Sequence, residues 1–343
     1  MHGSELRQDP TTKEWVVIAP GRSQRPHASI ATEKRQATAS TPAQDCPFCP
    51  GHEAMTPAEL LRIPVGLHWR VRVVPNKFGA FTPDAGPERH DGFFRTVAGA
   101  GYHEVIVEHP RHDIEMADMP EEHILRVLHA YRQRQIELCR DPLVQYVVIF
   151  RNYGEQAGTS ILHPHSQLLA TPVVPGYMRW KHELAERYFD DTHRNLYSDI
   201  LENERAAAVR MVEDSPEFSV FVPFASFVPY GMWIMPHTAR PSFAMASDEE
   251  LRKLSGVLQR SLQRLRNCCG NVNYNYVIHS CATRDQNEEY YMWHLQIIPR
   301  LTLPAGFELG SHIYINPTLP EECARQLREA LAPAAVQATA VSA

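Results

Sequence analysis

The sequence predicts an α+β fold made of two similar halves, in which antiparallel sheets are flanked by helices. Runs of β-branched and aromatic residues, such as residues 143–150, are typical of buried strands. Residues 120–139 and 247–265 carry apolar side chains at helical spacing, with acidic residues in the first turn. The same order of elements then occurs twice along 343 residues, a length that can form one large or two medium cores.

The first half is expected to contain a strand at residues 15–19, a strand that runs into a turn within 69–81, a strand that ends in histidines within 101–113, the helix at 120–139 and the strand at 143–150. It ends with a loop that leads into a strand at residues 163–170. A charged helical segment, residues 177–210, connects it to the second half. There the same plan is expected as a strand ending near residue 237, the helix at 247–265, and strands at 273–279 and 291–299, followed by a helix after Pro320.

The stretch His163-Pro164-His165-Ser166-Gln167 brings together side chains that can act in catalysis, namely two imidazoles and a carboxamide. Because side chains alternate along a strand, His163, His165 and Gln167 are expected to share one face. A neutral imidazole is a nucleophile toward phosphorus, and a neighbouring Gln can donate to a phosphoryl oxygen without adding charge. The alternative for such a pattern is a pair of histidines that only make hydrogen bonds at a strand edge.

The second half carries a diverged copy of this stretch. His294 and Gln296 correspond to His165 and Gln167, whereas Met292 stands at the place of His163. Since only the first half keeps both histidines, we expect the nucleophile there.

Cys46 and Cys49 form a Cys-x-x-Cys pattern flanked by proline and glycine, which is the turn chemistry of a metal knuckle. No second pattern of this kind exists, so the other ligands are expected to be histidines. A redox motif normally opens a helix, and Pro50-Gly51 would end such a helix at once. Two unpaired structural cysteines are the remaining alternative.

Composition excludes several classes of protein. A net charge of -6 argues against a general nucleic-acid or membrane-surface binder, so an anionic ligand needs a local basic patch. Seven scattered cysteines do not suggest a secreted disulfide framework. No apolar stretch is long enough to span a bilayer and no signal pattern opens the chain, so we expect a cytoplasmic protein. The loop with Arg22 and Arg25 either grips a diphosphate or is simply solvated.

Together these motifs resemble the galactose-1-phosphate uridylyltransferase family, a branch of the histidine-triad superfamily. The resemblance extends over residues 7–331 and includes Pro75-Asn76-Lys77-Phe78 and the closing segments 305–311 and 314–317. It implies two histidine-triad-like halves: residues 1–176, with a zinc site and the catalytic stretch, and residues 177–343, which contribute sugar-binding residues. It also implies a homodimer that binds neither nucleic acid nor membrane.

The resemblance further implies a ping-pong transfer of UMP from UDP-glucose to galactose 1-phosphate through a uridylyl intermediate on His165. Gln167 would bind the transferred phosphoryl group and Glu308 the sugar hydroxyls. The remaining expected substrate-binding residues are Arg22, Arg25, Asn76, Phe78, Asn152 and Ser160.

The family's structural zinc site maps onto Cys46, Cys49, His112 and His163, with His109 as a competitor of His112. Many members hold a second metal with a Glu and several histidines. Here Lys181 stands at the expected Glu position, and Met292 and Gln296 stand where further ligands would, so we do not expect a second metal beside His279 and His294.

Two other functions stay open at this point. The same histidine could form an adduct from an adenine nucleotide and pass it to phosphate, as in an ADP-sugar or dinucleoside-polyphosphate phosphorylase. A non-catalytic, zinc-stabilised nucleotide-binding module would instead form no covalent phosphohistidine.

Overall fold

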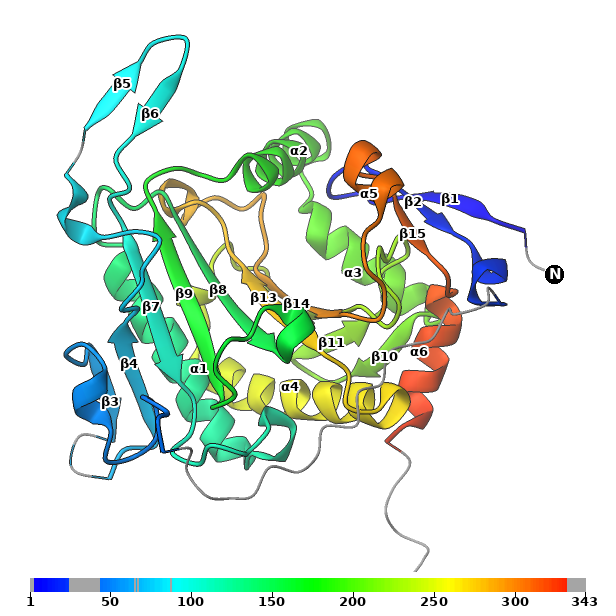
Figure 1. The fold of residues 1–343 in the computed structure, drawn as a ribbon. Coiled ribbons are helices and arrows are strands. Elements are labelled where there is room, and N and C mark those ends of the chain that lie inside the picture. The colour runs from blue at the N-terminus through cyan, green and yellow to red at the C-terminus, as the bar shows by residue number, and fades with distance from the viewer. Residues whose placement is uncertain (1–2, 25–43, 65, 67, 87, 332–343) are drawn as a thin grey trace, which may run out of the picture.

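A computed structural model describes residues 3–24, 44–64, 66, 68–86 and 88–331 (Figure 1). Arg25, one of the expected substrate-binding residues, lies outside the described residues.

The molecule is built around one ten-stranded sheet in which every neighbouring pair is antiparallel. Strands β8 and β13 pair at its middle, with Phe150 opposite Val277, and so join the strands of the first half to those of the second. The order across the sheet is β10 (Met211–Asp214), β11 (Phe218–Phe221), β12 (Met232–Pro236), β14 (His294–Pro299), β13 (Tyr274–His279), β8 (Tyr146–Tyr153), β9 (His165–Thr171), β7 (Tyr102–Val107), β4 (Val71–Pro75) and β3 (Leu61–Ile63).

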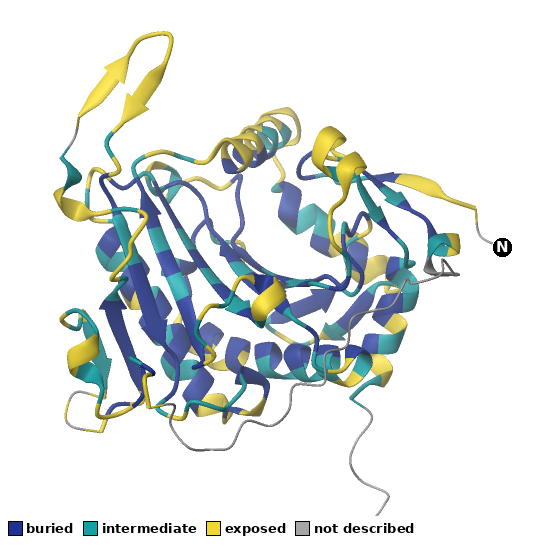
Figure 2. Cartoon of the chain, in the orientation of Figure 1, coloured by how far each residue is buried: buried dark blue, intermediate teal, exposed yellow. Residues whose placement is uncertain are grey.

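Two long helices cover one face of this sheet. Helix α1 (Glu121–Leu138) packs on β4, β7 and β8, and helix α4 (Asp248–Cys269) packs on β11 and β12. Helix α4 begins with a capping box, in which Ser247 and Glu250 satisfy each other's backbone N–H groups. The main hydrophobic core lies between these helices and the sheet, where Figure 2 shows continuous buried residues.

The opposite face is covered unevenly. Helices α2 (Gly176–Thr192) and α3 (Leu196–Ala207) pack there against side chains of the second half, including Phe221 and Trp233, in a second hydrophobic cluster. Over the strands of the first half this face carries no helix among the described residues (Figure 1).

A small three-stranded sheet brings the two ends of the described chain together. Strand β1 (Glu5–Gln8) pairs with β2 (Trp15–Ile18), and β15 (Tyr314–Asn316) pairs with β2 in parallel. Helices α5 (Gly306–Ser311) and α6 (Pro320–Glu329) flank β15. This parallel pair was not expected from the sequence, because nothing in two short segments 300 residues apart indicates their contact.

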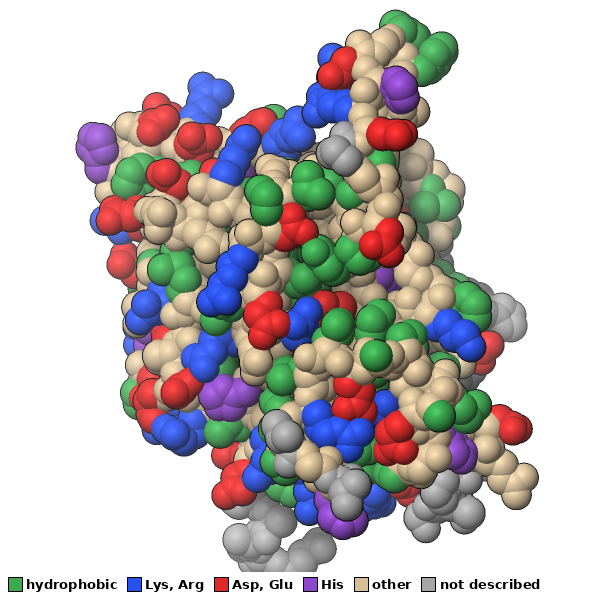
Figure 3. All heavy atoms as spheres, turned by 90° about the vertical axis from the view of Figure 1, so that its left-hand side faces the viewer, with side chains coloured by type: hydrophobic (Ala, Val, Ile, Leu, Met, Phe, Trp, Pro, Cys, Tyr) green, Lys and Arg blue, Asp and Glu red, His purple; other side chains and the backbone are tan. Residues whose placement is uncertain are grey.

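A hairpin of β5 (Arg89–Asp91) and β6 (Arg95–Val97) projects from the molecule (Figures 1 and 3). Phe93 and Phe94 at its tip are 95% and 85% exposed. The remaining elements are short 3₁₀ helices at Pro20–Gln24, Glu53–Met55, Pro83–Ala85, Met116–Asp118, Glu155–Ala157, Phe243–Met245 and Thr283–Asp285.

The predicted α+β class is confirmed, and so are the helices expected at residues 120–139 and 247–265. Several strand boundaries were wrong. The strand expected at residues 143–150 begins at Tyr146 and continues to Tyr153. The strands expected from residues 69, 163 and 291 begin at Val71, His165 and His294. Within the described ranges, no helix combines the length and the apolar character needed to cross a membrane.

Candidate active site and metal centre

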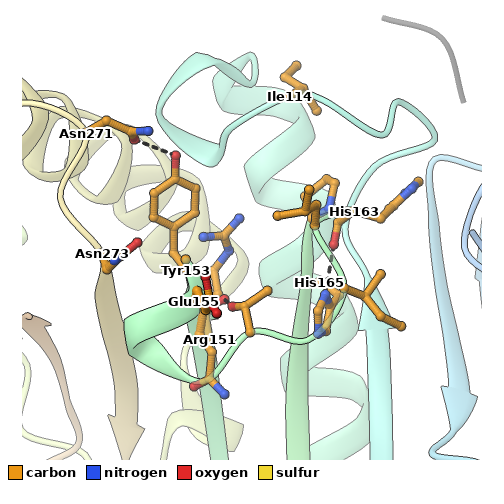
Figure 4. Close-up of a pocket in the computed structure, with 14 residues that line it drawn as sticks. Ile114, Arg151, Tyr153, Glu155, His163, His165, Asn271 and Asn273 are labelled. Carbon is orange, nitrogen blue, oxygen red and sulfur yellow. Dashed lines mark hydrogen bonds between the residues drawn. The ribbon is translucent and has the colours of Figure 1, made fainter. Parts of the chain in front are cut away.

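Strand β9 presents His165 and Gln167 on the open face of the sheet. The alternate residues Ser166 and Leu168 face helix α1: the Ser166 hydroxyl accepts a hydrogen bond of 2.6 Å from Tyr131, and Leu168 is in the core. Because side chains alternate, His165 and Gln167 point away from that helix. His165 lies at the edge of a pocket of about 320 Å³ (Figure 4), whose lining also includes Arg151, Asn152, Tyr153, Gly154, Glu155, Thr159, Ile161, Leu162, His163, Pro164, Ile114, Asn271 and Asn273.

The ring of His165 is held in one tautomer. Its Nδ1 lies 2.8 Å from the backbone carbonyl oxygen of His163, and since a carbonyl only accepts, Nδ1 carries the proton (Figure 4). The lone pair of the neutral ring is therefore on Nε2. Burial lowers the pKa of His165 below its ordinary value, which keeps the imidazole neutral near pH 7. A neutral, pre-oriented imidazole nitrogen is a competent nucleophile.

The loop after β8 forms the other wall of the pocket. Gly154 has a φ of +87°, and a Cβ there would lie 1.5 Å from Oδ1 of Asn273, so only glycine fits. Asn152 accepts a 2.7 Å hydrogen bond at Oδ1 from Asn275, which leaves its NH₂ group to donate to a ligand. This wall offers the neutral amides of Asn152 and Asn273 together with the carboxylate of Glu155.

A buried ion pair lies beneath the pocket. Nε of Arg151 donates to both carboxylate oxygens of Glu108, at 3.1 and 2.9 Å, and its guanidinium also donates to the hydroxyl of Tyr274 at 3.0 Å. Burial lowers the pKa of Arg151, but the Glu108 carboxylate outweighs that effect and raises it well above its ordinary value. Tyr131 links this pair to Ser166 of β9, because its hydroxyl donates to the Ser166 hydroxyl at 2.6 Å and its oxygen lies 3.2 Å from Oε1 of Glu108. The network thus ties β9, the strand of His165, to α1.

Cys46, Cys49, His112 and His163 bring their ligand atoms within 4.8 Å of one another. Sγ of Cys49 lies 3.5 Å from Nδ1 of His112 and 3.6 Å from Nδ1 of His163. Zn–S and Zn–N bonds of about 2.3 and 2.0 Å at a tetrahedral angle put sulfur and nitrogen about 3.5 Å apart, so these separations fit zinc. Nε2 of His163 donates to the carbonyl of His109 at 2.7 Å, which turns the Nδ1 lone pair toward the cysteines. The expected cluster is present, with His112 rather than His109 as its member.

A family model described as galactose-1-phosphate uridyl transferase, N-terminal domain, matches residues 1–175, and one described as a domain of unknown function (DUF4921) matches residues 100–341. An ADP-glucose phosphorylase of Arabidopsis thaliana is 33% identical over 95% of this chain and 92% of its own length. The chain belongs to the galactose-1-phosphate uridylyltransferase family.

The chain is also similar to a uridylyltransferase and to a solved phosphorylase structure. A galactose-1-phosphate uridylyltransferase of Thermotoga maritima is 27% identical over 95% of this chain and 98% of its own length. A crystal structure of an Arabidopsis thaliana ADP-glucose phosphorylase with bound ADP-glucose superposes with a TM-score of 0.83 at 31% identity, covering 96% of this chain and 99% of that one. The named relatives are nucleotidyltransferase-type enzymes, and this family member is an enzyme of that type.

The residues expected at the family's substrate site do not all gather at this pocket. Asn152 lines it, whereas Ser160 follows the lining residue Thr159 and is exposed. Asn76 and Phe78 lie in the turn after β4, where Asn76 accepts a hydrogen bond from the Phe78 N–H and the Phe78 ring is 87% exposed. Arg22 and Glu308 lie in other elements outside the lining, the first in the 3₁₀ helix Pro20–Gln24 and the second in α5.

Several residues of the site were missed. Arg151, Asn271 and Asn273 line the pocket but belong to no motif. Arg151 was overlooked because the predicted strand stopped one residue before it, although a charged residue that continues a buried strand is itself a signal of pairing.

In the second half of this family member, His294 lies on a strand as His165 does in the first half, but His294 is not open to a pocket. Nδ1 of His294 lies 3.1 Å from the carbonyl oxygen of Met292, as His165 does with His163, but His294 is fully buried. Its ring stacks on Trp233 and on His279, with ring centres 4.7 and 4.9 Å apart. Lys181 is buried over Trp233, 5.5 Å from the ring centre, and burial lowers its pKa to about 8.

Proposed function

We propose that this enzyme transfers a nucleotidyl group through Nε2 of His165, and that it takes an adenylyl group from an ADP-sugar and passes it to phosphate. The observation that carries the proposal is the 2.8 Å contact between Nδ1 of His165 and the carbonyl of His163, which assigns the free lone pair to Nε2 at the edge of the pocket.

The reaction has two in-line steps. Nε2 attacks the α-phosphorus of the ADP-sugar, the bond from that phosphorus to the bridging oxygen breaks, and the sugar 1-phosphate leaves with the electron pair. An oxygen of inorganic phosphate then attacks the adenylyl phosphorus, the P–N bond breaks, and ADP leaves as His165 regains its lone pair. Such transfers depend on positioning and on donors to the phosphoryl oxygens. Gln167 and the NH₂ group of Asn152 are proposed as such donors.

The choice of an adenine nucleotide rests on similarity. The 33% identical relative is named an ADP-glucose phosphorylase, and the solved structure with a TM-score of 0.83 contains ADP-glucose. A second candidate is transfer of UMP from UDP-glucose to galactose 1-phosphate, which the family model and the Thermotoga maritima relative support. The first is favoured because its relative is the more similar.

We propose that Cys46, Cys49, His112 and His163 hold a structural zinc ion. Four protein ligands leave no open position, so the ion would supply folding energy and fixed geometry. His163 connects this cluster to the nucleophile, because its ring faces Cys49 while its own carbonyl holds Nδ1 of His165. Roles in substrate binding for Arg22, Arg25, Asn76, Phe78, Ser160 and Glu308, a homodimer, and a cytoplasmic location stay predictions.

The test is intact-protein mass spectrometry after incubation with ADP-glucose or UDP-glucose and no acceptor, under conditions that preserve phosphohistidine. We expect a gain of one AMP with ADP-glucose, its loss on adding inorganic phosphate, and no gain in His165→Ala. The variant His90→Ala, which alters an exposed histidine of the hairpin, is the matched control. A gain of one UMP only, discharged by galactose 1-phosphate, would favour the second candidate. No adduct with either nucleotide, or an adduct that persists in His165→Ala, would refute the proposal.

A further inference from the structure

His103 lies on the same open face of the sheet as Gln167. Strands β7 and β9 pair with His103 opposite Leu169, so Gln167 is the diagonal neighbour of His103 on that face. Nε2 of His103 lies 2.7 Å from Oε1 of Gln167. None of the motifs that identify the family includes His103.

The tautomer of His103 follows from a backbone group. The N–H of Ala80 points at Nδ1 of His103 over 3.1 Å, and a backbone N–H can only donate. Nδ1 therefore carries the lone pair, and the proton of the neutral ring is on Nε2. That N–H donates to Oε1 of Gln167, since a carbonyl oxygen only accepts.

The same logic fixes the side-chain amide of Gln167. If the amide were turned over, its NH₂ group would face the N–H of His103, donor against donor. The NH₂ group of Asn76 also lies 3.1 Å from Nε2 of His103, but that nitrogen already donates to Gln167 and has no lone pair left. His103 thus holds Oε1 of Gln167, and the NH₂ group of Gln167 is the end that has no partner among the described side chains.

We propose that His103 is a positioning residue that orients Gln167 so that its NH₂ group donates to the phosphoryl group in transfer. The inference rests on the proposed function, because it assumes that Gln167 contacts the phosphoryl oxygens. It adds a chain of contacts from the turn after β4, through the Ala80 N–H and the His103 ring, to the residue beside the nucleophile. Without His103, the Gln167 amide would present either its NH₂ group or its carbonyl oxygen, and the oxygen repels a phosphoryl oxygen.

The test is a double-mutant cycle on the rate of adduct formation at saturating nucleotide sugar. We expect His103→Leu to lower this rate by about 10- to 100-fold, as for other residues that orient an active-site group, while the half-saturating concentration changes by less than about threefold. His103→Gln, whose NH₂ group can reach the place of Nε2, should restore most of the rate. In a Gln167→Ala background, His103→Leu should have no further effect.

Leu169→Ala is the matched control, because Leu169 lies opposite His103 in the same ladder but offers no hydrogen bond. Three results would each overturn the proposal. They are an equal loss of rate in Leu169→Ala and His103→Leu, an unchanged rate in His103→Leu, and a His103→Leu effect that is as large in the Gln167→Ala background as in the wild-type protein.

A separate readout does not need activity. Nitrogen-15 NMR of labelled histidine should show His103 as the Nε2–H tautomer, with the signal assigned by its absence in His103→Leu; an Nδ1–H tautomer would overturn the inference. If the wild-type protein forms no adduct, the proposed function fails, whereas this readout still decides how His103 is bonded.

Discussion

Removing one charge from the Glu108–Arg151 pair should be among the most destabilising single changes in the protein. The carboxylate of Glu108 is fully buried and the Arg151 side chain is 2% exposed. Glu108→Gln keeps the shape but leaves the guanidinium with a neutral partner. Breaking a buried pair from one side costs about 3–5 kcal/mol, because the remaining charge is desolvated without compensation. We expect the free energy of unfolding to fall by that amount.

Urea unfolding, followed by tryptophan fluorescence and by circular dichroism with coincident transitions, measures this loss. The double variant Glu108→Gln/Arg151→Met removes both charges, so its loss should be smaller than the sum of the single losses by about 2 kcal/mol or more. Asp91→Asn is the control: Arg89 and Asp91 form a pair on the hairpin that is more than half exposed, and its loss should stay below about 1 kcal/mol. Additive single losses, or equal losses at the two pairs, would refute the reasoning.

Three further predictions concern pH and metal. Because burial lowers the pKa of His165, the rate of adduct formation should stay level from pH 8 to 6.5 and fall only below that; a fall centred above pH 6.5 would contradict the assignment. Burial also lowers the pKa of His182 to about 4 and that of His279 to about 3, so below pH 6.5 the unfolded chain binds protons that the folded chain does not. Each should cost about 2 kcal/mol of stability at pH 5, measurable as the urea midpoint against pH and reduced in His182→Gln; a stability that rises on acidification would exclude this. Cys46→Ser should remove zinc and lower the melting temperature, and unchanged metal content by atomic absorption would refute the zinc cluster.

Local patterns predicted much of this molecule. The helical spacing of residues 120–139 and 247–265 was sufficient because each helix has one continuous apolar face toward the sheet. For the metal cluster, the local pattern gave Cys46 and Cys49 and the expectation that the other ligands are histidines, and the family resemblance supplied His112 and His163. The paired histidine stretch indicated His165 as a candidate, and that role stays a prediction. The expectation that His163 shares its strand face was wrong, because the strand begins at His165 and the ring of His163 turns to Cys49.

The remaining features depend on contacts that no local pattern records. Glu108 and Arg151 are 43 residues apart, and the local sequence around each of them predicts only an exposed charge at the end of a strand. His103 and Gln167 are 64 residues apart and meet only because β7 and β9 pair in one register. A shift of that register by one residue would put them on opposite faces. Such partners follow from the strand order and not from the residues themselves.

The two halves differ in what covers the sheet rather than in the sheet itself. His165 and His294 occupy equivalent strands, and each directs Nδ1 to the carbonyl two residues earlier. The ring of His294, however, is enclosed by aromatic side chains, with Tyr197 of α3 stacked 5.1 Å and Trp233 of β12 stacked 4.7 Å from it. Among the described residues, no helix covers the open face of the first half, so His165 lines a pocket while Nε2 of His294 is enclosed. Under the proposed function, an imidazole with the right tautomer is therefore not enough for catalysis. We propose that the open face above it determines which of the two halves can admit a nucleotide.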